Sequence, residues 1–224
     1  MWVSLNEIEQ TASKGARGAG YGWGLAEEAG AAARWLAMRG LPFLQPLTMG
    51  VLKQMQRLES LDSARRIGSS HRPVETANRL GPISVLTALS DELLLLPPLT
   101  GELSIRALAA PVLVLPALAR ISKRYDKPLL VRWPSVAIDC RAGTLTVDDA
   151  GRAGLQAVLA DWFTVTRLTA APIANQAVPN LRHQGADVNE NQWRELTAFA
   201  CRMYIPEAET SRLGGAGTGR TDND

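Results

Sequence analysis

A glycine-rich segment, GARGAGYGWGLAEEAG at residues 15–30, is the feature of this sequence that most constrains its fold. It places six glycines in sixteen positions and runs directly into AAARWL, which favours a helix. Each glycine adds conformational entropy to the unfolded chain, and folding has to overcome it. The segment is therefore either a mobile linker or a place where the backbone passes very close to another group. A tight corner between packed helices, with Tyr21 and Trp23 covering the core, is one such place, and a loop around a ligand is another.

Glycine-rich loops that lead into a helix also bind phosphate groups at the helix N-terminus. The glycine spacing here matches neither a P-loop nor a GxGxxG inside a βαβ unit, and no strand is predicted before it. Glu27 and Glu28 are expected in the first turn of the following helix, where a bound anion would lie. A nucleotide site is therefore disfavoured, and the sequence implies no particular cofactor.

Helices are predicted on both sides of the glycine-rich segment. Ser4 followed by Glu7 has the spacing of a capping box, and apolar residues then recur at helical spacing as far as Arg17. The same periodicity continues from Leu25 to a stop at Gly40. The AGAAA run in this second helix leaves one face almost without side chains, which favours close packing of another helix.

The rest of the chain predicts an α+β fold, with N-terminal helices, a small and mainly antiparallel sheet, and a closing helix. We expect residues 1–205 to form a single globular domain and residues 206–224 a glycine-rich tail. The elements expected in order are a helix over 42–60, a connector over 63–82, a helix within 83–96, a strand from 103, a helix ending at 125, two or three strands within 129–147, a short helix within 148–161, a strand over 162–168 and a closing helix over 189–203.

Composition excludes several classes of function. The formal net charge is +2 and the basic residues are scattered, so no nucleic-acid partner is predicted. The longest apolar run, residues 107–119, contains two prolines and is shorter than the roughly 20 residues that cross a bilayer. No membrane association is predicted. Cys140 and Cys201 are expected to be reduced core thiols of a cytoplasmic protein. His71 and His183 belong to no zinc motif, and no metal site is predicted.

The C-terminal segment, ETSRLGGAGTGRTDND, has the composition of a disordered tail, but its LGGAG echoes the ARGAG of the first motif. Together with SLNEIE near the start, these two segments resemble a bacterial family of unknown function that occurs mostly as a stand-alone chain of about this length. The resemblance extends over nearly the whole chain and is most specific at its ends. It implies no activity or catalytic residue. It does imply that the tail belongs to the natural protein. We expect the tail to fold back over the first motif.

If the two ends meet, their side chains can form a site. Guanidinium groups bind carboxylates through paired hydrogen bonds, and carboxylates carry protons. The candidate ligand-binding residues are Arg17, Tyr21, Arg34, Ser211 and Arg212, and the candidate proton carriers are Glu27, Glu28, Asp222 and Asp224.

Two hypotheses of function follow. The first is a cytoplasmic enzyme, or enzyme subunit, of small-molecule metabolism that acts on a carboxylate-bearing or amide-bearing metabolite, with the site between residues 15–28 and the tail. The alternative is a non-catalytic accessory or scaffold subunit that binds a partner protein through its Gly/Ala-rich helix and tail. Either protein could also form a homo-oligomer.

Overall fold

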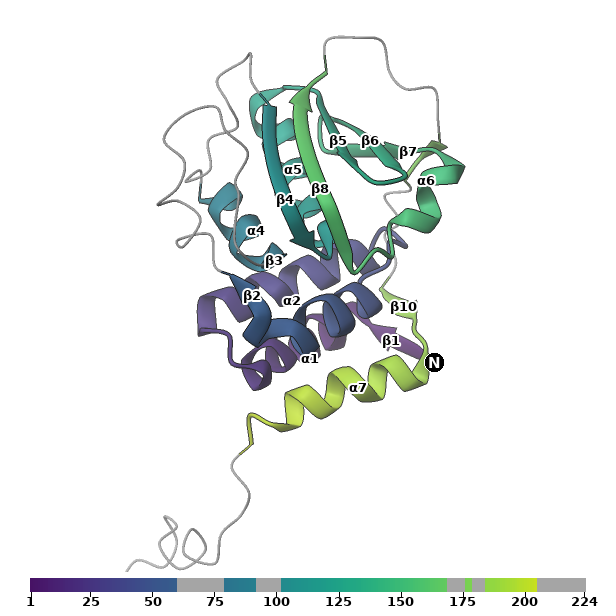
Figure 1. Cartoon of the computed structure of the whole chain (residues 1–224). Helices are drawn as coiled ribbons and strands as arrows, with labels where there is room; N and C mark the ends of the chain where they lie inside the picture. Colours follow the sequence, from purple (N-terminus) through teal and green to yellow (C-terminus); the bar gives the residue numbers. More distant parts are fainter. Residues whose placement is uncertain (60–78, 92–101, 169–175, 179–183, 205–224) are drawn as a thin grey trace, which may run out of the picture.

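The computed structural model describes residues 1–59, 79–91, 102–168, 176–178 and 184–204 (Figure 1). The N-terminal part contains β1 (Trp2–Ser4), α1 (Leu5–Ala19), α2 (Trp23–Ala37), the π-helix η1 (Pro46–Val51), the 3-10 helix η2 (Leu52–Arg57), β2 (Leu58–Glu59), β3 (Arg79–Leu80) and α4 (Pro82–Ser90). The remainder contains β4 (Glu102–Ala109), the 3-10 helix η3 (Pro111–Val114), α5 (Leu115–Tyr125), β5 (Leu129–Trp133), β6 (Val136–Arg141), β7 (Thr144–Val147), α6 (Asp149–Gly154), β8 (Leu159–Arg167), β9 (Gln176–Ala177), β10 (Gly185–Asp187) and α7 (Glu190–Cys201).

An eight-stranded sheet has the order β2-β3-β4-β8-β5-β6-β7-β9. The pairs among β2, β3 and β4 are parallel, and the pairs from β4 through β8 to β9 are antiparallel. Strands β1 and β10 form a separate antiparallel ribbon. The predicted α+β class, with a mainly antiparallel sheet between N-terminal helices and a closing helix, is confirmed.

The helices form two groups around this sheet. Helix α5 lies behind the sheet, while α1 and α7 lie below it on the side of the chain's N-terminus (Figure 1). Ser122 on α5 donates a hydrogen bond to the carbonyl of Cys140 on β6 at 2.9 Å, which fixes helix and strand together. Helix α2 runs between the two groups.

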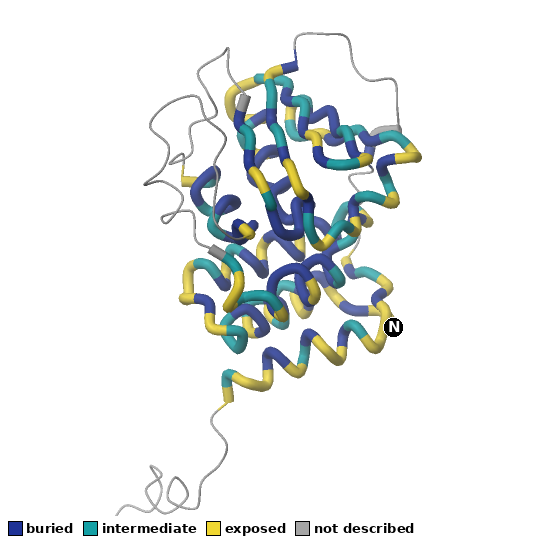
Figure 2. Tube along the Cα trace, viewed as in Figure 1, coloured by how far each residue is buried: buried dark blue, intermediate teal, exposed yellow. Residues whose placement is uncertain are grey.

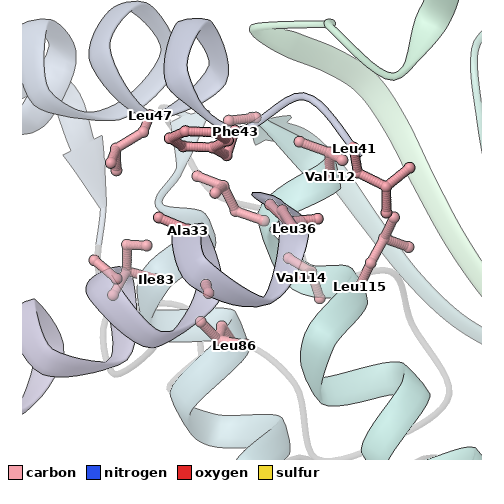
Figure 3. Packing of buried hydrophobic residues seen from close by; sticks show 14 of the residues in the cluster. Ala33, Leu36, Leu41, Phe43, Leu47, Ile83, Leu86, Val112, Val114 and Leu115 are labelled. Atoms are coloured by element: carbon pink, nitrogen blue, oxygen red, sulfur yellow. The ribbon is translucent and has the colours of Figure 1, made fainter. Parts of the chain in front are cut away.

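Helix α2 also carries the centre of the apolar core (Figure 3). Its residues Ala33 and Leu36 meet side chains from the segment before η1, from α4 and from η3. Buried residues follow the inward faces of the elements, whereas exposed residues follow the outer ones (Figure 2). The labelled core residues are Ala33, Leu36, Leu41, Phe43, Leu47, Ile83, Leu86, Val112, Val114 and Leu115.

The helix predicted over residues 42–60 is the element that departs furthest from expectation. The chain instead forms the π-helix η1 and the 3-10 helix η2 and then enters β2. Pro46 has no N–H to donate within a helix and its ring crowds the preceding turn. Thr48 donates a hydrogen bond back to the carbonyl of Leu44 at 2.8 Å, which further perturbs the backbone ladder.

Smaller differences occur at element ends. Residues 79 and 80, expected in a connector, form β3, and residues 63–78 of that connector lie outside the described part. The ribbon strands β1 and β10 were not predicted because three residues are too few to show a period. Helix α2 starts at Trp23, so Glu27 and Glu28 occupy its second turn and not its first. Within the described residues, no helix combines the length and apolar character needed to span a membrane.

The two cysteines differ in a way that the sequence did not predict. Cys140 is buried in β6 and its surroundings raise the thiol pKa to about 12, chiefly through burial. Cys201 is exposed at the end of α7, so its predicted role as a core thiol is wrong. Cys201 lies at helical spacing from the exposed Arg194 and Ala198 on the outer face of α7, away from the buried Leu196 and Phe199, and this leaves its side chain in solvent.

A thiol reagent should therefore distinguish the two cysteines. In native protein at pH 8 we expect one rapidly reacting thiol, Cys201, because Cys140 stays protonated and covered. Cys201→Ser should abolish the fast phase, and denaturant should expose a second thiol. A fast phase that survives in the Cys201→Ser variant would contradict this assignment.

Candidate functional site

The tight corner between α1 and α2 explains why position 20 is a glycine. Gly20 has a φ of 110°, in the left-handed region that glycine adopts without strain. Its N–H donates to the carbonyl of Arg17 at 2.9 Å, and the N–H of Tyr21 donates to that of Ala16 at 3.0 Å. These two hydrogen bonds form a Schellman motif, which satisfies the last carbonyls of α1.

Other glycines of the segment allow helices to pack closely. A Cβ at Gly18 would overlap the carbonyl oxygen of Phe199 on α7 and lie 2.9 Å from the carbonyl carbon of the same residue. A Cβ at Gly30 would overlap the hydroxyl of Ser13 and lie 2.6 Å from the carbonyl oxygen of Glu9 on α1. The segment is thus a tight helical corner that holds α1 against both α2 and α7.

Arg17, Tyr21 and Trp23 lie together at this corner. The Nη1 of Arg17 donates to the carbonyl of Tyr21, and the guanidinium lies 4.5 Å from the ring centroid of Trp23. Burial raises the pKa of Tyr21 to about 12. Trp23 is 64% exposed, so the prediction that it covers the core is wrong. It occupies the first position of α2 and faces outward over Arg17.

The other predicted site residues are spread over the two helices. Arg34 forms an ion pair with Glu9 at 2.6 Å, eight residues and therefore about 12 Å along α1 from Arg17. Glu27 is exposed and Glu28 is partly buried. Arg17 and Arg34 thus do not share a site. Ser211, Arg212, Asp222 and Asp224 lie outside the described residues.

A cleft borders the glycine corner. It has a volume of about 470 Å³ and lies where α1, η2 and α7 end close together. The methyl of Met55 sits 3.2 Å from the position that a Cβ of Gly20 would take, so the cleft begins at the corner itself. We call it the basic cleft; its lining residues are Ala19, Leu52, Lys53, Gln54, Met55, Gln56, Arg57, Phe199 and Arg202.

Three cationic side chains line the basic cleft, and no carboxylate does among the described residues. Lys53 is neutralised by an ion pair with Glu195 at 3.0 Å. The guanidinium of Arg202 lies 4.2 Å from the ring centroid of Phe199. Arg57 ends η2 with no ion-pair partner in the described part of the chain. Among the described residues, Arg57 and Arg202 therefore have no carboxylate partner at the cleft.

Gln54 is a further polar residue in the lining of the basic cleft. Its side-chain oxygen is buried and has no hydrogen-bond partner within the described structure. A buried acceptor without a donor is costly, so such an atom is expected to meet a donor from a ligand or a water molecule. The cleft thus offers cations for an anionic group, and the amide side chain of Gln54 lies beside them in its lining.

None of the described residues predicted as site residues lines the basic cleft. The sequence contained a signal for it in KQMQR at residues 53–57, where two basic and two amide side chains fall within five residues of the predicted third helix. Arg202 follows the closing helix, 145 residues later in the chain. Only the packing of α7 against α1 brings it to η2. Among the described residues, no group of three or more His, Cys, Asp and Glu side chains is placed to hold a metal ion.

The Gly/Ala-rich face of α2, which the alternative hypothesis assigns to a partner protein, is already covered inside the molecule. Ala26, Ala29 and Ala33 are fully buried, and Gly30 packs against α1. A partner that approached α2 would therefore meet its outer face, where Trp23 is exposed.

Comparison with curated proteins finds no match to this chain. The resemblance to a family of unknown function is confirmed over the N-terminal helices and the glycine-rich corner, whereas the C-terminal motif lies beyond the matched residues. Residues 3–72, which include α1, α2, η1 and η2, match the family described as "Protein of unknown function (DUF3726)".

Proposed function

We propose that this protein binds a small carboxylate-bearing metabolite in the basic cleft and acts in the cytoplasm as an enzyme, or enzyme subunit, of small-molecule metabolism. The observation that carries the proposal is the meeting of Arg57, Arg202 and the amide of Gln54 in the lining of one cleft of about 470 Å³ beside the glycine corner. A cleft of this size is in the range that holds small metabolites.

The lining suggests which groups the ligand carries. A carboxylate would pair with Arg57 or Arg202, because a guanidinium stays charged at all physiological pH values and can donate two parallel hydrogen bonds. An N–H or O–H of the same ligand would donate to the Gln54 oxygen once that side chain turns from its buried position toward the cleft. Hydroxy acids, amino acids and amide-bearing acids satisfy both requirements. An aliphatic acid without a donor satisfies only the first.

A reaction would also need a proton carrier. Within this proposal the candidates remain Glu27 and Glu28, which follow the glycine corner on α2, and Asp222 in the C-terminal segment. The chain enters that segment after Tyr204, two residues beyond Arg202 of the cleft. This short distance along the chain is the reason to keep the tail, with Ser211 and Arg212, in the proposed site.

Ligand binding can be tested by thermal unfolding with malate, glutamate, glutamine and succinate, each compared with the derivative in which its carboxylates are converted to amides. A ligand at one hundred times its dissociation constant stabilises a folded protein by about 2.7 kcal/mol, which shifts the midpoint of a chain of this size by roughly 5–10 °C. We expect at least one carboxylate with a donor group to produce such a shift. Arg57→Gln and Arg202→Gln should each weaken that ligand's affinity at least about tenfold, the effect of losing a charged hydrogen bond.

Arg132→Gln is the matched control, because Arg132 is exposed on β5 and does not line the cleft. It should leave the shift unchanged. Carboxylate binding that persists unaltered in both cleft variants would overturn the proposal. The accessory-subunit alternative gains support if no metabolite binds and removal of residues 206–224 releases a co-purifying protein while the thermal midpoint stays constant.

A further inference from the structure

A second cleft lies at the opposite end of α7 from the basic cleft. It has a volume of about 640 Å³ and is bounded by the β1–β10 ribbon, residues 40–45 after α2, and the start of α7. Gln192 in this cleft lies on α7, and Arg202 in the basic cleft caps the end of that helix ten residues later, a separation of about 15 Å. The two clefts are therefore distinct sites. We call the second one the ribbon cleft.

The ribbon places an aromatic ring beside a carboxylate. Trp2 on β1 is directly paired with Asp187 on β10 in the antiparallel register, so their side chains project from the same face. Both line the ribbon cleft. Trp2 is 58% exposed, an unusual state for the largest apolar side chain.

Gly185 holds the Trp2 ring in place. A Cβ at Gly185 would lie 2.7 Å from Cε2 and 2.8 Å from Cζ2 of Trp2, so the indole rests against the bare backbone of β10. One part of the ring is thus supported by protein while much of its surface is open to the cleft. An aromatic side chain that is both fixed and exposed is suited to stacking against a ligand.

The charge of the ribbon cleft is opposite to that of the basic cleft. Asp187 is the one ionisable side chain among the described residues that line it, and the other polar side chains are the amides of Gln45, Gln156, Asn189 and Gln192. The start of α7 offers little to an anion, because the Asn189 side chain already accepts hydrogen bonds from the N–H groups of Asn191 and Gln192 at 3.0 and 3.2 Å. The Met1 amino group donates to the carbonyl of Val188 at 2.9 Å and is not part of the lining.

We propose that the ribbon cleft binds a small organic cation of the alkylammonium class. An indole ring attracts cations through its electron-rich face more strongly than other aromatic rings do. Asp187, the cross-strand neighbour of Trp2, supplies the counter-charge, and the glutamine side chains can bond to hydroxyl or carbonyl groups that the cation carries. This assignment is independent of what the basic cleft binds.

Choline and 3,3-dimethyl-1-butanol test this proposal directly, because they have the same shape and differ in the positive charge. Calorimetric titration of the full chain should show choline binding at least about tenfold tighter than the neutral alcohol. Trp2→Ala should weaken choline binding by between about twofold and thirtyfold, which corresponds to the usual strength of about 0.5–2 kcal/mol for a single cation–π contact. Asp187→Asn should weaken choline binding and leave the alcohol unaffected.

Trp162→Ala and Arg57→Gln are the controls, since Trp162 is a 43% exposed tryptophan outside both clefts and Arg57 belongs to the basic cleft. Both should bind choline as the unsubstituted chain does. The indole N–H resonance of Trp2, identified by its loss in Trp2→Phe, should shift with choline and not with the alcohol. Absence of choline binding, equal binding of the alcohol, or an unshifted Trp2 resonance would each overturn the proposal.

Discussion

Gly18→Ala is expected to lower the free energy of unfolding by about 2–3 kcal/mol, near the upper end for an overpacked site. The added methyl would overlap the carbonyl oxygen of Phe199, which belongs to the backbone of α7 and cannot rotate away as a side chain could. Helix α7 would have to move off α1. Urea unfolding followed by far-UV circular dichroism measures the change.

Gly24→Ala is the matched control for this experiment. Gly24 is the second residue of α2, and apart from its chain neighbours and the backbone of its own helix no atom of the described structure lies within 4 Å of the position that its Cβ would take. Alanine favours a helix over glycine by up to about 1 kcal/mol, so this variant should be slightly more stable than the unsubstituted chain. Similar stabilities for the two variants would show that α7 does not pack on Gly18 as the structure has it.

Trp133→Ala is expected to have the largest effect of any single substitution considered, a loss of about 3–5 kcal/mol. Trp133 on β5 is 1% exposed, its ring centroid lies 6.1 Å from that of Phe163 on β8, and its indole N–H donates to the carbonyl of Gly154 at 3.2 Å. Alanine would leave a cavity between the sheet and α6 and would remove one of the two hydrogen bonds that the Gly154 carbonyl accepts, the other coming from the N–H of Ala157. A loss of this size is a large part of the stability of an ordinary domain.

Thermal unfolding of Trp133→Ala, Trp133→Phe and Trp162→Ala measures the loss of stability in each variant. The comparison separates the effect of losing buried packing from the effect of losing any aromatic side chain. Trp133→Phe retains most of the ring and should lose less than the alanine variant. Trp162→Ala changes a partly exposed side chain on β8 and should cost under about 1 kcal/mol. Equal losses at positions 133 and 162 would contradict the burial described for β5.

The packing of α1, α2 and α7 contributes to the stability of the protein and also forms the walls of both proposed sites. The basic cleft needs the end of α7 to lie beside η2, and the ribbon cleft needs the start of α7 to lie beside the loop after α2. Gly18 sets how closely α7 approaches α1. A substitution at Gly18 would shift the end of α7, which carries Phe199 and is followed by Arg202. We therefore expect it to weaken ligand binding in the basic cleft while the sheet remains folded.

Several elements could be predicted because their signals are local. Ser4 accepts the N–H of Glu7 at 3.1 Å, as the capping-box spacing predicts, and Leu5, Ile8, Ala12 and Ala16 are buried on one face of α1. The strands within 129–147 likewise follow β-branched residues and turn signals. The regular helix predicted over residues 42–60 was wrong, because the spacing of apolar residues carries no information on how Pro46 and Thr48 disturb the hydrogen bonds of a helix.

The sequence by itself determined the α+β class, the position of most helices and strands, and the need for close backbone contact around residues 15–30, since these depend on side-chain period, capping and the conformational freedom of glycine. Only the tertiary structure decided what the glycines contact and which charged residues meet. Arg57 and Arg202 come together, and so do Trp2 and Asp187, because helix packing and strand register join positions that no local pattern relates.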